Sequence, residues 1–302
     1  MIGLRLYNIK YMNNFKKIVY LIRSILYLPL RLILLIGNFY SYILKIIDRR
    51  NHDTFWSEIM QKSIDKNISE KINIAPDKDI RFYCPSKISS FRVKTFFTKE
   101  PETLNWINTN GAENKVLYDL GANMGIYTIY YAKKFKSDVF AFEPSFKNLD
   151  LLMKNIKLNS LEENVFVIPN PISEKSLISN FFQLRSTPGG SVSTFNDKET
   201  KNMLLNNNKE ENDSYQYKTL GFSIDNLIET NLIKPPDLIK IDVDGNELDI
   251  IKGFKKTIKR VEKLTMLIET NTSTSKNNLI NELNDCGLKK INEVSVNSIW
   301  EK

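Results

Sequence analysis

The chain has 302 residues, and with 42% hydrophobic and 26% charged residues its composition is that of a globular protein, which excludes disorder as the main state. Residues 1–50 hold nine Lys or Arg and one acid, Asp48, so they carry the whole net charge of +8, while the rest of the chain is neutral. A nucleic-acid-binding domain, which would carry a basic face on its folded body, is therefore excluded. With His52 as the single histidine, a Ser-His-Asp hydrolase and a histidine-ligated zinc site are excluded as well.

The segment from Phe15 to Ile47 is strongly apolar, but its longest uncharged run, Leu32–Leu44, has thirteen residues. A spanning helix needs about 20 apolar residues, so a basic amphipathic helix at the membrane interface, broken or kinked at Pro29, is the better prediction. We expect residues 15–50 to bind an anionic membrane surface, and the alternative is a helix packed on the catalytic domain or on a second subunit. The polar face of this helix contains Lys16, Arg23, Arg31, Asn38, Ser41, Lys45 and Arg49.

The next part of the chain leads from the basic segment into the functional domain. Residues 51–75 are polar and are predicted to form a helical connector, and the functional domain is predicted to span residues 76–302. Short strands are predicted at Ile80–Tyr83 and Phe91–Val93, followed by a helix at Glu102–Thr109. Two cysteines, Cys84 and Cys286, give no disulfide framework and fit a reducing, cytoplasmic compartment.

The segment Val116–Thr128 contains the strongest functional pattern. Val116–Leu120 reads as a strand buried on both faces, glycines follow at Gly121 and Gly125, and a helical pattern then runs from Ile126 to Phe135. Without a Cβ, Gly121 allows a sharp turn and Gly125 allows the first helical turn to come close to a ligand. A strand, tight turn and helix in this order form a crevice that binds a small polar ligand.

The next strand, Asp138–Phe142, ends at an acid, Glu143, that is placed to bind a ribose. Glu143 follows Gly121 by 22 residues, a spacing at which a carboxylate accepts both ribose hydroxyls. Asn123 stands where dinucleotide enzymes have the glycine that makes room for a pyrophosphate, and Asp119 adds negative charge where a sulfonium or ammonium would lie. These features favour S-adenosylmethionine; a plain turn without a ligand and a nicotinamide-dependent oxidoreductase are the alternatives.

Strand and helix patterns alternate through the remaining chain, which predicts a largely parallel sheet. Asn170 follows the third strand and is a candidate contact to the nucleoside base, or a residue of a plain turn. Residues 184–217 are poor in apolar side chains and are predicted to form a flexible lid or substrate-facing insertion, or a disordered surface loop. The predicted elements are helices at Ser145–Ser160, Leu248–Ile258 and Ser275–Asp285, strands at Val165–Ile168, Asp237–Val243 and Leu264–Ile268, and a strand or hairpin at Ile291–Trp300.

The sequence resembles the FkbM family of S-adenosylmethionine-dependent methyltransferases over roughly residues 80–300. The resemblance lies in Tyr118–Gly125, Phe142–Ser145, Asn155–Asn159 and, most specifically, Asp237–Glu247. It implies a class I methyltransferase fold, a doubly wound α/β Rossmann-like sheet of seven strands with an antiparallel last strand, and O-methylation of a sugar, glycolipid or other secondary metabolite. It also implies that Glu143 holds the ribose and that the methionine end is lined by Asp119, Gly121, Ala122, Asn123 and Gly125.

Methyl transfer from a sulfonium depends mainly on holding the acceptor oxygen in line, so a general base is helpful and not obligatory. Asp242 and Asp244 follow a buried strand beside the expected methyl position, and either could take the hydroxyl proton. Asp242 could instead bind the backbone or the cofactor amine. The oxygen ligands Asp242, Asp244, Glu269 and Asn271 could hold Mg²⁺, but acidic strand ends are commonly only solvated, so no metal is predicted.

The leading hypothesis is a methyltransferase at the inner face of the cytoplasmic membrane that acts on a lipid-linked or surface-glycan precursor. An inert membrane-bound scaffold is the alternative from another class. Its support is Asp244, which stands where family members usually have Glu. The acceptor and the oligomeric state are left open by the sequence.

Overall fold

The computed structural model describes residues 25–47, 63, 68–76, 78–184, 187–207, 214–270 and 276–302. The chain divides into two compact units, residues 1–67 and 68–302. In the first unit the helix α2 (Leu28–Ile47) begins at the break that was predicted around Pro29, and its large apolar side chains, such as Leu32, Leu35 and Phe39, are exposed. Within the described ranges, no helix combines the length and apolar character needed to cross a membrane.

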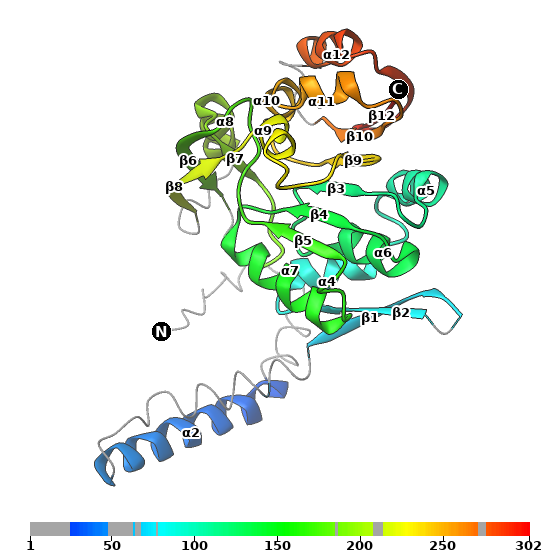
Figure 1. Ribbon diagram of the computed structural model, residues 1–302. Helices are drawn as coiled ribbons and strands as arrows, with labels where there is room; N and C mark the ends of the chain where they lie inside the picture. The colour runs from blue at the N-terminus through cyan, green and yellow to red at the C-terminus, as the bar shows by residue number, and fades with distance from the viewer. Residues whose placement is uncertain are drawn as a thin grey trace, which may run out of the picture. The chain divides into compact units, whose positions relative to one another are not determined.

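The second unit is built on a seven-stranded sheet with the order β11-β12-β10-β9-β3-β4-β5 (Figure 1). The neighbours from β10 to β5 pair in parallel, and the last strand, β12, is antiparallel to both β10 and β11. This confirms the predicted α/β doubly wound class I methyltransferase fold. The strands are β3 (Leu117–Leu120), β4 (Val139–Phe142), β5 (Val165–Ile168), β9 (Leu238–Ile241), β10 (Thr265–Glu269), β11 (Lys289–Val294) and β12 (Asn297–Glu301).

Alternate residues of the central strands face two separate hydrophobic cores, because successive side chains of a strand point to opposite faces. Leu117 and Val139 belong to one core, and Tyr118 and Phe140 belong to the other. The apolar runs predicted as strands buried on both faces are thus confirmed. Helices α5 (Pro101–Asn110), α6 (Ile126–Phe135) and α7 (Phe146–Leu158) cover the first face, and α9 (Ile224–Glu229), α10 (Glu247–Lys252), α11 (Lys255–Arg260) and α12 (Lys276–Asp285) cover the second.

Two predictions ahead of the sheet are wrong. Residues 69–75 of the expected helical connector form a strand, β1 (Ser69–Ala75), which pairs with β2 (Lys78–Tyr83) and buries Ile72 in the core. The expected strand at 91–93 is part of a helix, α4 (Lys87–Lys94). A capping box between Ser86 and Ser89 starts this helix and offsets its low apolar content, so a short alternating pattern is overridden by local hydrogen bonding.

Residues between β5 and β9 form a small three-stranded antiparallel sheet in the order β7-β6-β8. The segment predicted as a flexible lid, 184–217, contains β7, α8 and the first residues of β8, and its positions 185–186 and 208–213 lie outside the described residues. Regular structure therefore replaces much of the expected loop. The elements are β6 (Leu177–Gln183), β7 (Ser193–Phe195), α8 (Lys198–Asn207) and β8 (Tyr215–Gly221).

The interior side chain of Asn155 joins the β1–β2 hairpin to the glycine turn. Asn155 is fully buried on α7, where its Oδ1 accepts from the backbone N–H of Tyr83 at 2.7 Å and its Nδ2 donates to the Met124 carbonyl at 2.8 Å. The hairpin is thus fastened to the same turn that the sequence assigns to the cofactor.

We expect Asn155→Ala to lower the free energy of unfolding by about 3 kcal/mol, because each of two buried backbone groups left without a partner costs about 1–3 kcal/mol. Urea denaturation followed by circular dichroism measures this change. Lys157→Ala, at an exposed position of the same helix, is the matched control and should change stability by less than about 0.5 kcal/mol. Equal effects of the two substitutions would contradict the role of Asn155.

Candidate active site

A cavity of about 200 Å³ lies where the carboxyl ends of the parallel strands meet. The strand order reverses at β3, which is where open α/β sheets bind ligands. Six of the predicted site residues line this cavity, and Ala122 lines a smaller cavity next to it. Of the described residues predicted for the site, Asp119 and Gly125 line neither cavity. The six are Gly121, Asn123, Glu143, Asn170, Asp242 and Asp244.

The two glycines of the turn serve close packing within the protein. Gly121 has φ +80°, and a Cβ there would lie 2.0 Å from the Asp242 carbonyl oxygen at the end of β9. Gly125 has φ +84° at the start of α6, and its Cβ would meet Leu152 Cδ1 at 2.5 Å. Gly125 therefore packs closely on α7, and its approach to a ligand stays a prediction.

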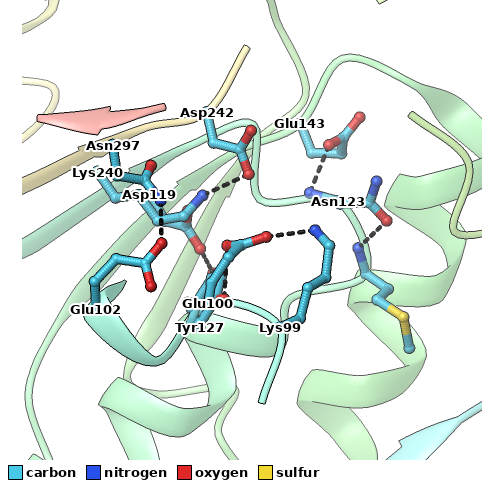
Figure 2. Close-up of polar contacts among 12 residues, drawn as sticks. Lys99, Glu100, Glu102, Asp119, Asn123, Tyr127, Glu143, Lys240, Asp242 and Asn297 are labelled. Carbon is cyan, nitrogen blue, oxygen red and sulfur yellow. Dashed lines mark hydrogen bonds and ion pairs between the residues drawn. The ribbon is translucent and has the colours of Figure 1, made fainter. Parts of the chain in front are cut away.

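Glu143 is 5% exposed, and backbone N–H groups hold its carboxylate at the cavity wall. Its Oε2 accepts from the N–H of Asn123 at 2.7 Å (Figure 2). Its Oε1 accepts from the N–H of Ser145 at 2.9 Å. Burial raises the pKa of Glu143 to about 7, although these donors favour the charged form. A carboxylate has about four lone-pair sites, so further hydroxyl donors can be accommodated.

Asn123 occupies the position at which dinucleotide enzymes have a glycine, and it connects the glycine turn to the insertion at residues 184–217. It adopts φ 52°, a left-handed conformation that asparagine tolerates well. Its Oδ1 accepts from the N–H of Met124 at 2.8 Å, and its Nδ2 donates to the Gly190 carbonyl at 2.9 Å. Both polar atoms of the side chain are therefore engaged within the protein.

Side chains from two distant helices hold the loop at residues 188–190. Asn148 on α7 donates to the Gly190 carbonyl at 2.9 Å and accepts from the N–H of Gly189 at 3.0 Å. Arg92 on α4 donates from Nε to the Gly189 carbonyl, also at 2.9 Å. Sequence reasoning missed Arg92 and Asn148, because these partners are 41 to 97 residues away from the loop.

Asp244 belongs to the same set of loop contacts. Its Oδ2 accepts from the N–H groups of Val192 and Ser193, both at 2.9 Å. Burial raises its pKa, opposed by these two donors. The shorter side chain at this position thus has a defined structural use, and its role as a general base stays a prediction.

Lys240 is a buried charge in the centre of the sheet that sequence reasoning left without a role. Its Nζ lies 3.0 Å from Asp242 Oδ2 and 3.6 Å from Asp119 Oδ1, and Thr128 donates to Asp119 Oδ2 at 2.6 Å. Asp119 is therefore buried between Thr128 and Lys240 behind the turn, and its place at the methionine end stays a prediction. A lysine inside the apolar run Leu238–Ile241 was the available signal, because a fully buried lysine needs a partner.

The charges of this pair decide the ionisation of Asp242. Burial would raise the pKa of Asp242, but the Lys240 ammonium outweighs it and holds the pKa below its ordinary value. Burial alone would lower the pKa of Lys240, because it disfavours the charged form. The carboxylates of Asp242 and Asp119 outweigh burial and raise this pKa. Asp242 thus stays ionised and is a weak base, better suited to balance a cation than to remove a hydroxyl proton.

The acidic groups at the strand ends are arranged differently from the predicted magnesium set. Within the described part of the chain, Glu100, Asp242 and Glu269 have carboxylate oxygens within 4.8 Å of one another. Asp244 instead bonds the loop, and Asn271 lies outside the described residues. Lys99 pairs with Glu100 and Lys240 pairs with Asp242, so ammonium groups already balance part of this charge (Figure 2).

The fold is that of the class I methyltransferases. Residues 119–289 match the methyltransferase FkbM domain, and the chain belongs to this family. The hexuronic acid methyltransferase AglP of Haloferax volcanii is 25% identical over 174 residues, covering 54% of this chain and 59% of that protein. Methyltransferase sdnD of Sordaria araneosa is 25% identical over 191 residues, covering 58% of this chain and 72% of that protein. The chain thus spans about 59% of the length of the first relative.

Solved structures show a similar arrangement at low sequence identity. The methyltransferase FkbM of Methylobacillus flagellatus KT is 16% identical with a TM-score of 0.42, covering 71% of this chain and 52% of that chain. The precorrin-6y C5,15-methyltransferase of Geobacter metallireducens GS-15 is 13% identical with a TM-score of 0.40, covering 68% of this chain and 89% of that chain.

We expect Gly121→Ala to destabilise the protein by more than about 2 kcal/mol, because the new methyl group would collide with the Asp242 carbonyl in a backbone conformation that alanine also disfavours. Thermal and urea unfolding measure the loss. Gly287→Ala is the matched control, since Gly287 has φ +86° but open space around its Cβ, with the nearest atom 3.7 Å away. If both variants lose the same amount of stability, the collision with the Asp242 carbonyl at the end of β9 does not contribute to the loss.

Proposed function

We propose that the protein is an S-adenosylmethionine-dependent O-methyltransferase that modifies a hydroxyl of a sugar, glycolipid or surface-glycan precursor. The observation that carries the proposal is the buried Glu143 carboxylate, held at the wall of the cavity beside the Gly121 turn. Such a carboxylate at the end of the strand next to the glycine turn is placed to accept the hydroxyls of a ribose.

The residues around Glu143 fit the rest of a nucleoside. Beyond it the cavity wall includes Pro171, Ile172 and Phe181, which offer apolar surface to a flat base. On the other side, Asn123 blocks the position of a pyrophosphate by its contact with Gly190. A phosphate-free adenosine cofactor therefore suits this cavity better than a dinucleotide.

S-adenosylmethionine, when bound, supplies a methyl group that is already activated by the sulfonium, so the protein has to position the acceptor and exclude water. The loop at residues 188–193, bonded to Asn123, Asn148, Arg92 and Asp244, forms a fixed wall for this purpose. Asp242, kept ionised by Lys240, provides negative charge beside a cationic centre. The chain thereby supplies orientation and charge balance.

The acceptor class is supported by the family and by the first relative. A protein that is 25% identical to this chain methylates a hexuronic acid according to its name, which favours a saccharide acceptor here. The basic N-terminal segment and the exposed apolar side chains of α2 favour a lipid-linked form of that acceptor at an anionic membrane surface. We place the protein at the cytoplasmic face on these grounds.

We expect Glu143→Gln to weaken binding of S-adenosylhomocysteine by roughly 10- to 100-fold, because an ionised acceptor of the ribose hydroxyls is lost. Binding to the unaltered protein should tighten by about tenfold between about pH 6 and pH 8, since the pKa of Glu143 is about 7 and the ionised form accepts both hydroxyls. Isothermal titration calorimetry measures both effects.

The Glu143→Gln variant should lose this pH dependence, and Glu162→Gln, at an exposed position, should bind as the unaltered protein does. Absence of any binding by the folded, unaltered protein would refute the proposed cofactor. A flat pH profile with normal affinity would show that Glu143 does not contact the ribose.

For the membrane we expect deletion of residues 1–50 to abolish sedimentation with phosphatidylglycerol-containing vesicles while leaving cofactor affinity unchanged. Replacing Leu32 and Leu35 by Glu should weaken vesicle binding in the full chain, because both side chains are exposed on α2 and would have to enter the interface. Vesicles of phosphatidylcholine alone are the control for the charge contribution. Equal sedimentation of the full chain and the deletion variant would argue against the membrane helix.

A further inference from the structure

A second cavity of about 40 Å³ adjoins the main one on the side of α4 and α6. The two share five lining residues, Arg92, Lys99, Gly121, Asn123 and Asp242, so they meet at the glycine turn. A water-sized group takes about 10–15 Å³ of such a volume, so about three fit there. A small polar group that extends from a ligand in the main cavity would fit there.

Arg92 is the charged side chain that joins the two cavities. It is partly buried on α4, and its Nε is held by the Gly189 carbonyl at 2.9 Å. Among the residues that the structure describes, its two terminal amino groups have no hydrogen-bond partner. The positive charge of Arg92 nevertheless favours the ionised forms of Asp242 and Asp244. A guanidinium that is fixed at one nitrogen and open at the others matches the geometry of a carboxylate.

The other walls of the small cavity add charges of both signs. Ile126 and Tyr127, in the first turn of the ten-residue helix α6, line it, and a helix N-terminus favours an anion. Lys99 pairs with Glu100, whose Oε2 also accepts from the Tyr127 hydroxyl at 2.8 Å (Figure 2). Positive groups thus line the same cavity as the carboxylates of Glu100 and Asp242, a pattern that suits a zwitterion better than an ion of one sign.

We infer that the small cavity holds the amino-acid end of the cofactor and that Arg92 binds its carboxylate. The inference rests on the proposed function, in which Glu143 holds the ribose at the main cavity and the glycine turn lies between the two cavities. It assigns part of the cofactor site to α4, a helix that lies before the family domain at residues 119–289. The acidic residues that line the same cavity, Glu100 and Asp242, bind the ammonium group.

The test compares two ligands that share the nucleoside and differ in the amino-acid end. S-adenosylhomocysteine carries the α-amino acid, and 5′-methylthioadenosine lacks it. We expect Arg92→Gln to weaken binding of S-adenosylhomocysteine by roughly 10- to 100-fold and to change binding of 5′-methylthioadenosine less than about twofold. Lys94→Gln, an exposed position on the same helix, is the matched control and should leave both affinities unchanged.

Decarboxylated S-adenosylmethionine separates the two charges of the zwitterion. The unaltered protein should bind it more weakly than S-adenosylmethionine, and Arg92→Gln should remove that difference, whereas Arg92→Lys should restore part of it. Equal losses for S-adenosylhomocysteine and 5′-methylthioadenosine, or no loss for either, would overturn the inference and leave the proposed function standing. Failure of the unaltered protein to bind any of these ligands would instead overturn the proposed function.

Discussion

The buried carboxylate of Glu143 is the group on which the site depends. One of its oxygens fixes the glycine turn through the N–H of Asn123, and the other fixes the start of α7 through the N–H of Ser145. Asn123, positioned in this way, reaches the Gly190 carbonyl, where Asn148 of α7 also binds. Glu143, the glycine turn and the wall of the insertion are thus linked by consecutive hydrogen bonds, and a change at one end should be transmitted to the other.

Charge pairing is the second organising feature, because the site contains more ionised groups than a buried region tolerates without partners. Lys240 serves both Asp119 behind the turn and Asp242 at the cavity. Arg92 and Lys99 enter from the segment ahead of the family domain. Positive and negative groups thereby line the same pair of cavities.

The family assignment and the sheet were predictable because they depend on local patterns. The buried strands, the glycines at 121 and 125, and the acid at 143 each follow from runs of a few residues and their spacing. The elements ahead of the sheet were less predictable. Strand β1 is stabilised by pairing with β2, and helix α4 by the capping box of Ser86 and Ser89, and short apolar patterns reveal neither.

The sequence by itself therefore determined the parallel sheet, the turn at Gly121 and the acid Glu143 at the end of β4, since each is set by residues close together in the chain. The tertiary structure alone decided that Asp119 faces Lys240, that Gly125 packs on α7, and that the loop around Gly190 is bonded in place. Those outcomes depend on contacts between residues 27 to 121 positions apart. Such contacts form only when the strands have paired and the helices have docked.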